Sequence, residues 1–107
     1  MDHEQDSRVD YSVIRRIAVL AIDNPPVNAM SSRVRSDLAT MLARAAADSN
    51  VDAIVLTCRG TTFVAGADIR ELGKTVGEIS TPDLFATVER SDKPVIAAIH
   101  GRALGGG

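Results

Sequence analysis

Cysteine and aromatic residues are scarce in this sequence, and their scarcity limits what the chain can be. Cys58 is the single cysteine, so an intrachain disulfide and a cysteine-based metal cluster are excluded. It ends an apolar run, which favours a buried and inert thiol. There is no tryptophan, and Tyr11, Phe63 and Phe85 are the only aromatic residues, so the core must consist mainly of Val, Ile, Leu and Ala.

Long hydrophobic runs and an excess of one charge are also missing. No apolar stretch reaches the about 18 residues of a membrane span, and the polar N-terminus is unlike a signal peptide. The 12 basic and 14 acidic residues are dispersed and leave a net charge of −2, which argues against nucleic acid or an anionic membrane surface as a partner. Because 107 residues bury only a modest core, we expect one domain or less. Without a signal-peptide pattern or a membrane span, we expect a cytoplasmic protein.

Short apolar runs alternate with one clear helical pattern. Residues 11–14 and 17–22 are expected to form a hairpin around Arg15 and Arg16, although arginine does not favour the positive φ of a tight turn. Ser31 or Ser32 is expected to cap the helix that follows. Five apolar residues recur at the spacing of one helix face, namely Val34, Leu38, Met41, Leu42 and Ala45.

The second half of the chain continues this alternation. The apolar run at 53–58 predicts a parallel strand covered on both faces, and a right-handed crossover would return it beside the strand at 17–22. Thr81 is expected to cap a short helix, with Pro82 at its first position. The apolar run at 94–99 predicts another strand buried on both faces, entered through a proline that needs no ladder hydrogen bond.

Glycine is concentrated after this last strand, in the stretch KPVIAAIHGRALGGG that ends at Gly107. Its glycines leave backbone N–H groups open to a ligand, and a helix that begins nearby would direct its positive end to the same place. Such a segment suits a group that develops negative charge. A tight turn or close helix packing is the alternative interpretation, and the spacing does not fit the G-x-G-x-x-G pattern of nucleotide loops.

A second stretch of small residues, TFVAGADIREL at 62–72, precedes it. Ala65, Gly66 and Ala67 are small enough for a ligand to touch the backbone. Asp68, with an acidic residue three positions later, has the spacing of a helix start, so a capping role is favoured over that of a catalytic acid. His100 is expected to be structural, because no serine or cysteine nearby supplies a nucleophile for it.

Taken together, FVAGADIREL, KPVIAAIHGRALGGG and the earlier NPPVNA at 24–29 resemble the enoyl-CoA hydratase/isomerase (crotonase) superfamily. They look most like the hydratase/isomerase part at the start of bacterial multifunctional fatty-acid oxidation proteins. Three ordered motifs are more specific than any one of them. The resemblance covers residues 10–107, after a polar tail at 1–9. It implies an α/β fold, a crotonase-like spiral of strand-strand-helix units of which this chain holds the N-terminal part.

The resemblance also implies the chemistry. The substrate would be an acyl-CoA thioester, with coenzyme A as part of the substrate and with no metal or other cofactor. The backbone amides of Ala67 and Gly106 would form an oxyanion hole that stabilises a thioester enolate. The implied substrate-binding residues are Ala65, Gly66, Asp68 and Gly105.

Hydratases of this superfamily carry two catalytic glutamates beyond the GGG run. We therefore expect a fragment, inactive by itself, of a β-oxidation enzyme whose reaction, as a lyase or an isomerase, depends on those later acids. A catalytically silent acyl-CoA-binding or interaction module would look the same up to Gly107. The resemblance leaves a homo-oligomer of the intact protein open.

Overall fold

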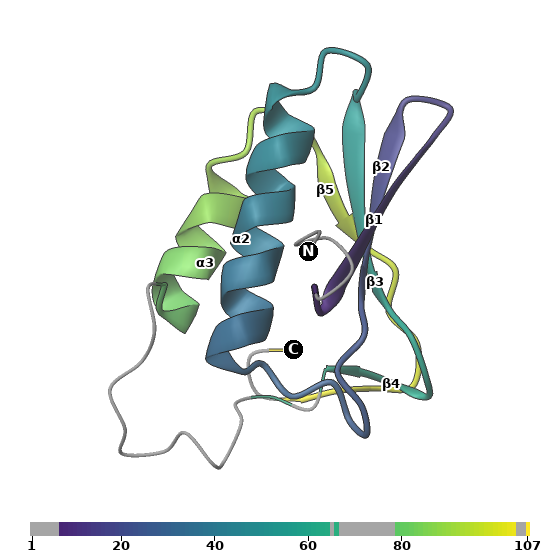
Figure 1. Cartoon of the computed structure of the whole chain (residues 1–107), viewed down its shortest axis with the longest axis vertical. Helices are drawn as coiled ribbons and strands as arrows, with labels where there is room; N and C mark the ends of the chain where they lie inside the picture. Colours follow the sequence, from purple (N-terminus) through teal and green to yellow (C-terminus); the bar gives the residue numbers. More distant parts are fainter. Residues whose placement is uncertain (1–6, 65, 67–78, 105–106) are drawn as a thin grey trace.

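The computed structural model describes residues 7–64, 66, 79–104 and 107. Within them, a four-stranded sheet has the strand order β1-β2-β3-β5, and β4 and β6 form a separate two-stranded sheet. The helices α2 and α3 lie side by side on one face of the larger sheet, and β4 lies beyond its lower end (Figure 1). The α/β class expected from the sequence is confirmed.

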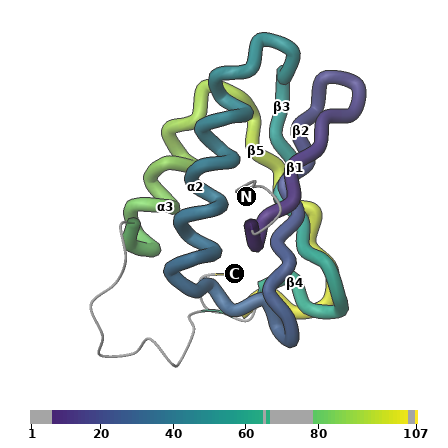
Figure 2. Tube along the Cα trace, viewed as in Figure 1, coloured from purple at the N-terminus to yellow at the C-terminus, as the bar shows by residue number. Residues whose placement is uncertain are grey.

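The elements alternate along the chain as the sequence indicates. They are β1 (Val9–Ile14), β2 (Ile17–Ile22), α2 (Ser32–Ala47), β3 (Ala53–Cys58), β4 (Thr62–Val64), α3 (Thr81–Glu89), β5 (Val95–Ala97) and β6 (Arg102–Ala103). β1 and β2 are antiparallel, whereas β2 pairs with β3, and β3 with β5, in parallel. Each parallel pair is joined through a helix, so the chain returns twice to the same sheet, with β5 beside β3 (Figure 2).

The hairpin of β1 and β2 is confirmed, but its turn goes against residue preference. Arg15 and Arg16 both adopt positive φ, at 48° and 69°. Two such residues match the twist of the flanking strands. Arg16 donates from Nε to the Asp52 carboxylate at 2.7 Å and from Nη2 to the Ser49 carbonyl at 2.9 Å. These contacts with the connection between α2 and β3 offset the conformational cost of positive φ at an arginine.

α2 has the cap and the buried face that its pattern predicts. Ser31 is the N-cap, and its hydroxyl accepts a hydrogen bond from the Val34 amide at 3.2 Å. All five apolar positions of the predicted face are buried. At the other end, Lys93 Nζ donates to the carbonyl oxygens of Ala45 and Asp48, both at 2.7 Å. Lys93 thus satisfies carbonyl groups that a helix end leaves without intrahelical partners.

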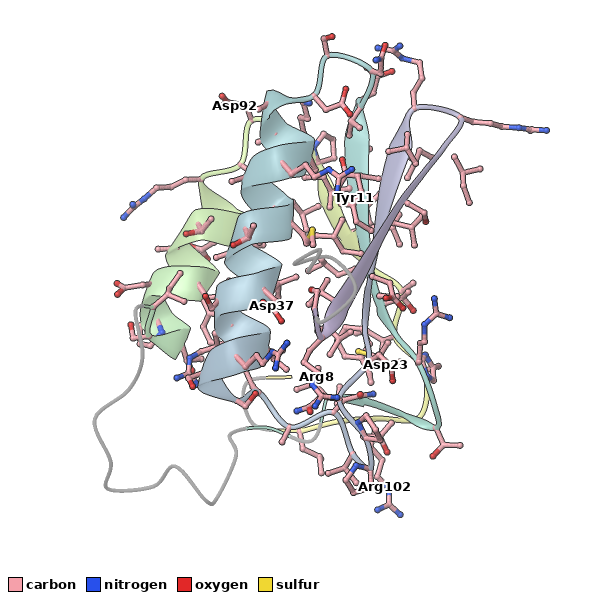
Figure 3. All side chains as sticks on the ribbon, in the orientation of Figure 1. Arg8, Tyr11, Asp23, Asp37, Asp92 and Arg102 are labelled. Carbon is pink, nitrogen blue, oxygen red and sulfur yellow. The ribbon has the colours of Figure 1, made fainter. Side chains whose placement is uncertain are left out.

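Two contacts across the layer tie β1 and the residue before it to α2, and Figure 3 labels three of the residues involved, namely Arg8, Tyr11 and Asp37. The Arg8 amide donates to the Asp37 carboxylate at 2.8 Å. The Arg44 guanidinium lies 4.1 Å from the centre of the Tyr11 ring, a geometry that favours a cation–π interaction. Arg8 and β1 are therefore fixed against α2.

α3 begins with a different cap from the expected one. Ser80, not Thr81, is the N-cap, because its hydroxyl accepts from the Asp83 amide at 3.2 Å. Pro82 is therefore the second helical residue and not the first. Both positions tolerate proline, since neither amide has an intrahelical partner to lose.

The apolar runs at 53–58 and 94–99 predict strands covered on both faces, but the described residues do not supply cover on both. β3 buries Ile54 and Cys58 and leaves its other side chains half-buried. β5 is an edge strand, and its Ile96 is 54% exposed. The helices pack on one face of the sheet, so apolar side chains on the opposite face remain in contact with water.

These exposed apolar side chains predict self-association of the purified chain. Ile96, Ile99 and Leu104 are each more than half exposed, on or just after the edge strand β5 and after β6. An edge strand with apolar side chains is a template for pairing with another copy. In sedimentation velocity we expect reversible oligomers or aggregates for the wild type, and a shift toward monomer for Ile96→Lys. A wild-type chain that stays monomeric across the same concentrations as Ile96→Lys would contradict this prediction.

Cys58 predicts a dependence of stability on pH. The residue is buried, and burial raises the pKa of its thiol from 9.0 to about 11. Between these values the unfolded chain loses the thiol proton while the folded chain keeps it, so the free energy of unfolding falls as the pH rises. The measurement is urea unfolding of the wild type and Cys58→Ala at several values across this window. As the pH rises, the free energy of unfolding of the wild type should fall relative to that of Cys58→Ala. A difference that stays constant with pH would show that the pKa of Cys58 is not raised by folding.

Candidate functional site

Only one of the six residues expected to form the site is among the described residues. Gly66 is described, whereas Ala65, Ala67, Asp68, Gly105 and Gly106 lie outside the described residues. Their expected roles therefore stay predictions. The described residues next to them define the surroundings in which those roles would operate.

The two glycine-bearing stretches are brought together by the pairing of β4 with β6. The strands are parallel, with Thr62 opposite Arg102 and Val64 opposite Ala103. The Leu104 amide extends the ladder by donating to the Val64 carbonyl at 2.8 Å. Val64 and Leu104, the described residues directly before positions 65 and 105, therefore lie side by side. The sequence did not predict these strands, which are only three and two residues long.

Glycine is required where the stretches meet. A Cβ placed on Gly107 would lie 2.5 Å from the Val64 carbonyl oxygen and 2.7 Å from its Cβ. A side chain at this position would force the two stretches apart. Gly66 has a φ of 102°, a backbone conformation that residues with a side chain rarely adopt.

A buried asparagine fixes the approach to β4. Asn28 is 4% exposed, and its Nδ2 donates to the carbonyl oxygens of Arg59 at 2.8 Å and Thr62 at 2.7 Å. Its Oδ1 accepts from the Asn24 amide at 2.8 Å. Both Nδ2 hydrogens and the carbonyl oxygen of the side chain are thereby engaged. Asn28 ties the loop at 24–29, which contains the cis peptide bond between Pro25 and Pro26, to the turn between β3 and β4.

The residue directly after this loop, Met30, contacts Gly66. The Met30 amide donates to the Gly66 carbonyl at 2.7 Å. Arg35, which is 3% exposed, donates from Nη1 to the Met30 carbonyl at 2.8 Å and from Nε to the Ile79 carbonyl at 2.9 Å. Sequence reasoning missed Arg35. The available signal was its place three residues before Leu38 on the apolar face of α2, where a charge is unusual.

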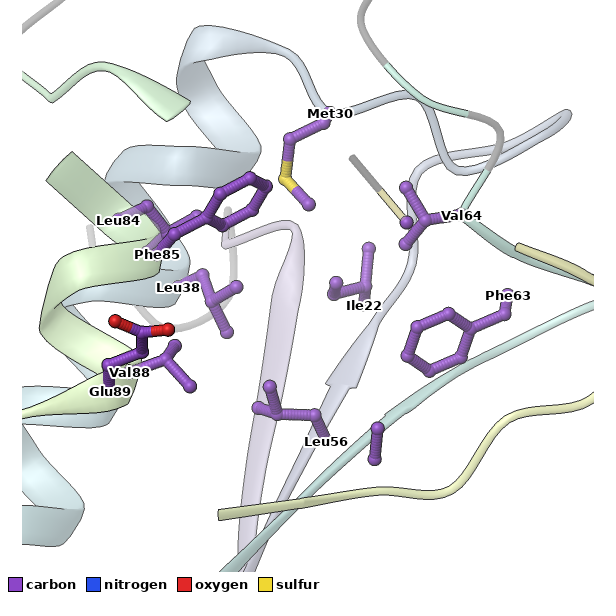
Figure 4. A pocket seen from close by; sticks show the side chains of 12 residues that line it. Ile22, Met30, Leu38, Leu56, Phe63, Val64, Leu84, Phe85, Val88 and Glu89 are labelled. Carbon is purple, nitrogen blue, oxygen red and sulfur yellow. The ribbon is translucent and has the colours of Figure 1, made fainter. Parts of the chain in front are cut away.

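An apolar cavity of about 290 Å³ opens beside these segments. Side chains of α2 and α3, among them Leu38 and Leu84, line one side, and Met30 and Val64 line the other (Figure 4). Gly107 also borders it. Among the described lining residues, Glu89 is the one that carries a charge, and hydrocarbon groups fit such surroundings.

The other candidate groups are structural or absent in the described part of the chain. His100 Nε2 lies 2.8 Å from the Gly60 carbonyl oxygen, which agrees with the structural role expected for it. The Cys58 thiol stays protonated at neutral pH, because burial raises its pKa to about 11. Residues 7–64, 66, 79–104 and 107 contain no group of three metal-ligating side chains. No helix formed by these residues is long and apolar enough to cross a membrane.

Asn28 offers a test of how this loop is held. Asn28→Ala leaves two partly buried carbonyl oxygens and one amide without their side-chain partner, and it puts alanine at a φ of 53°. We expect the free energy of unfolding to fall by about 3 kcal/mol or more. Urea unfolding followed by circular dichroism measures the change. The exposed Asn50 is the control, since Asn50→Ala should stay within about 0.5 kcal/mol of the wild type. Equal losses in the two variants would contradict the role given to Asn28.

Comparison with known proteins gives the family. The sequence model of the enoyl-CoA hydratase/isomerase family matches residues 14–107. A probable enoyl-CoA hydratase of Bacillus subtilis is 40% identical, over 92% of this chain and 41% of that protein. The peroxisomal bifunctional enzyme of Danio rerio is 41% identical, over 91% of this chain and 14% of that protein. The crystal structure of an enoyl-CoA hydratase from Bacillus anthracis has a TM-score of 0.83 at 25% identity, covering 94% of this chain and 43% of that chain.

These matches confirm the crotonase-like spiral that the motifs predicted. The chain spans less than half the length of the Bacillus relatives that it matches. The similarity to a bifunctional enzyme agrees with the predicted likeness to multifunctional proteins. Because the family's sequence model matches nearly the whole chain, residues 14–107, the chain belongs to the enoyl-CoA hydratase/isomerase family.

Proposed function

We propose that the chain binds an acyl-CoA thioester and stabilises its enolate through the backbone amides of Ala67 and Gly106. The observation that carries this proposal is the parallel pairing of β4 with β6, which joins Val64 to Leu104 by a hydrogen bond just before the two glycine-bearing stretches. N–H donors directed at an oxygen that gains charge in the transition state are among the strongest catalytic contributions. The remaining substrate contacts are assigned to Ala65, Gly66, Asp68 and Gly105.

The apolar cavity is the proposed site of the acyl group. Its lining from α2, α3 and β4 is apolar, and its border includes Gly107, the residue directly after one proposed donor. A thioester carbonyl held by that donor would therefore lie near the mouth of the cavity. Burial of the hydrocarbon chain supplies binding energy at roughly 25 cal/mol per Å² of apolar surface.

The reaction follows from where the charge moves. In hydration, water gives up a proton to a base and adds to the β-carbon of the enoyl thioester, charge moves to the thioester oxygen, and the α-carbon then takes a proton. In isomerisation, a base removes the α-proton of a 3-enoyl thioester to give a dienolate on the same oxygen, and the γ-carbon then takes a proton. Both reactions need acid and base groups, and Glu89 is the single carboxylate among the described residues that line the cavity.

We therefore divide the function between this chain and the intact protein. Binding and enolate stabilisation are assigned to residues 1–107. Hydration or isomerisation in fatty acid metabolism is assigned to the intact protein, with the two glutamates of the superfamily's hydratases beyond Gly107. The chain covers 41% of the Bacillus subtilis hydratase, which supports this division. We place the intact enzyme in the cytoplasm, with no cofactor other than the coenzyme A of its substrate.

The proposed donor at Ala67 is tested in the intact enzyme by removing its N–H. Ala67→Pro deletes this amide, and loss of one oxyanion donor costs about 2.7–4 kcal/mol in the transition state, so kcat for crotonyl-CoA should fall roughly 100- to 1,000-fold. Ala67→Ser keeps the N–H and should retain most of the activity.

The comparison requires that both variants are folded, because proline also restricts the residue before it. Circular dichroism and the thermal midpoint of each variant should stay close to those of the wild type. A folded Ala67→Pro enzyme with a near-normal kcat would remove Ala67 from the oxyanion hole.

A further inference from the structure

Arg35 is a buried charge whose position calls for an explanation. It is 3% exposed on the first turn of α2, and burial of a guanidinium is costly unless its donors are satisfied. Two of its donors reach backbone carbonyls that are far apart in the sequence, those of Met30 and Ile79.

The contacts of Arg35 lead to Gly66 on one side. Arg35 Nη1 holds the Met30 carbonyl at 2.8 Å, and the Met30 amide donates to the Gly66 carbonyl at 2.7 Å. A peptide group is planar, with its C=O and N–H pointing in opposite directions. A hydrogen bond that fixes the direction of the Gly66 carbonyl therefore also fixes the direction of the N–H in the same peptide group. Glycine has few steric limits of its own, so this direction depends on external contacts.

On the other side, Arg35 Nε donates to the Ile79 carbonyl at 2.9 Å. Gly66 and Ile79 are the described residues on either side of 67–78. One side chain thus acts on both flanks of the stretch in which the proposed oxyanion donor lies, directly at Ile79 and through Met30 at Gly66.

We propose that Arg35 is a positioning residue for the oxyanion hole, which orients the peptide after Gly66 through the backbone of Met30, whose carbonyl it binds and whose amide donates to Gly66. The inference rests on the proposed function. Arg35 touches no reacting atom and acts through Met30. Its loss should weaken the binding of a ligand with negative charge on the thioester oxygen much more than the binding of a neutral thioester, because an oxyanion hole responds to developing charge.

Two coenzyme A thioesters separate this role from a general effect on folding. Acetoacetyl-CoA readily forms an enolate, whereas butyryl-CoA keeps a neutral carbonyl, and both carry the same coenzyme A. The ratio of their dissociation constants, measured by isothermal titration calorimetry on the intact protein, does not depend on the folded fraction. For Arg35→Met we expect acetoacetyl-CoA to bind roughly 10-fold more weakly, the size of one hydrogen bond to a charged group, with butyryl-CoA within about 2-fold of the wild type.

Arg33 provides the matched control on the same helix. Its side chain is 52% exposed and lies 3.7 Å from Asp37, so Arg33→Met should leave both constants unchanged. If Arg35→Met fails to fold, Arg35→Gln is used in its place, because glutamine keeps one N–H donor group. This variant should lose part of the wild-type preference for acetoacetyl-CoA over butyryl-CoA. A folded Arg35 variant with the wild-type ratio overturns the positioning role. A wild-type protein that binds neither thioester overturns the proposed function, and this inference with it.

Discussion

The hydrogen bonds of the buried Asn28 side chain are the constraint on which the arrangement around the cavity depends. They join the loop at 24–29 to the turn that leads into β4, and the Met30 amide then reaches the Gly66 carbonyl. Apolar contacts alone would let these segments slide, because dispersion and burial have little directionality. A buried amide group with every donor and acceptor engaged specifies one arrangement, since any shift leaves a polar group without its partner.

The small sheet of β4 and β6 illustrates this dependence. Two strands of three and two residues are too short to be stable alone. They form because β4 is held from one side by Asn28 and because β6 follows β5, which is fixed in the larger sheet by its pairing with β3. The close approach of Gly107 to Val64 then needs a residue without a side chain. The glycine-rich sequence and the polar loop thus serve the same junction.

Local patterns predicted most of the fold, and contacts between distant segments explain what they missed. The apolar face of α2 and the strands β2 and β3 follow from their periodicity, and their burial or pairing agrees with it. The exposure of Ile96 does not follow from the apolar run itself, which does not reveal how many layers cover it, but agrees with a chain that holds only part of the fold. The burial and the contacts of Arg35 were not predicted, because its partners are backbone carbonyls from other parts of the chain. At the site, sequence motifs alone indicate Ala67 and Gly106.

The proposed oxyanion hole requires that the backbone of this chain polarises the carbonyl of a bound thioester. The most direct test is the infrared carbonyl band of acetyl-CoA or butyryl-CoA, labelled with ¹³C at the thioester carbon and bound to the protein. N–H donors in a site shielded from water draw electron density onto the oxygen more strongly than water does. We predict that the band of the bound thioester moves to lower frequency than that of the same thioester in water. A bound band at the frequency found in water, or above it, would contradict the account.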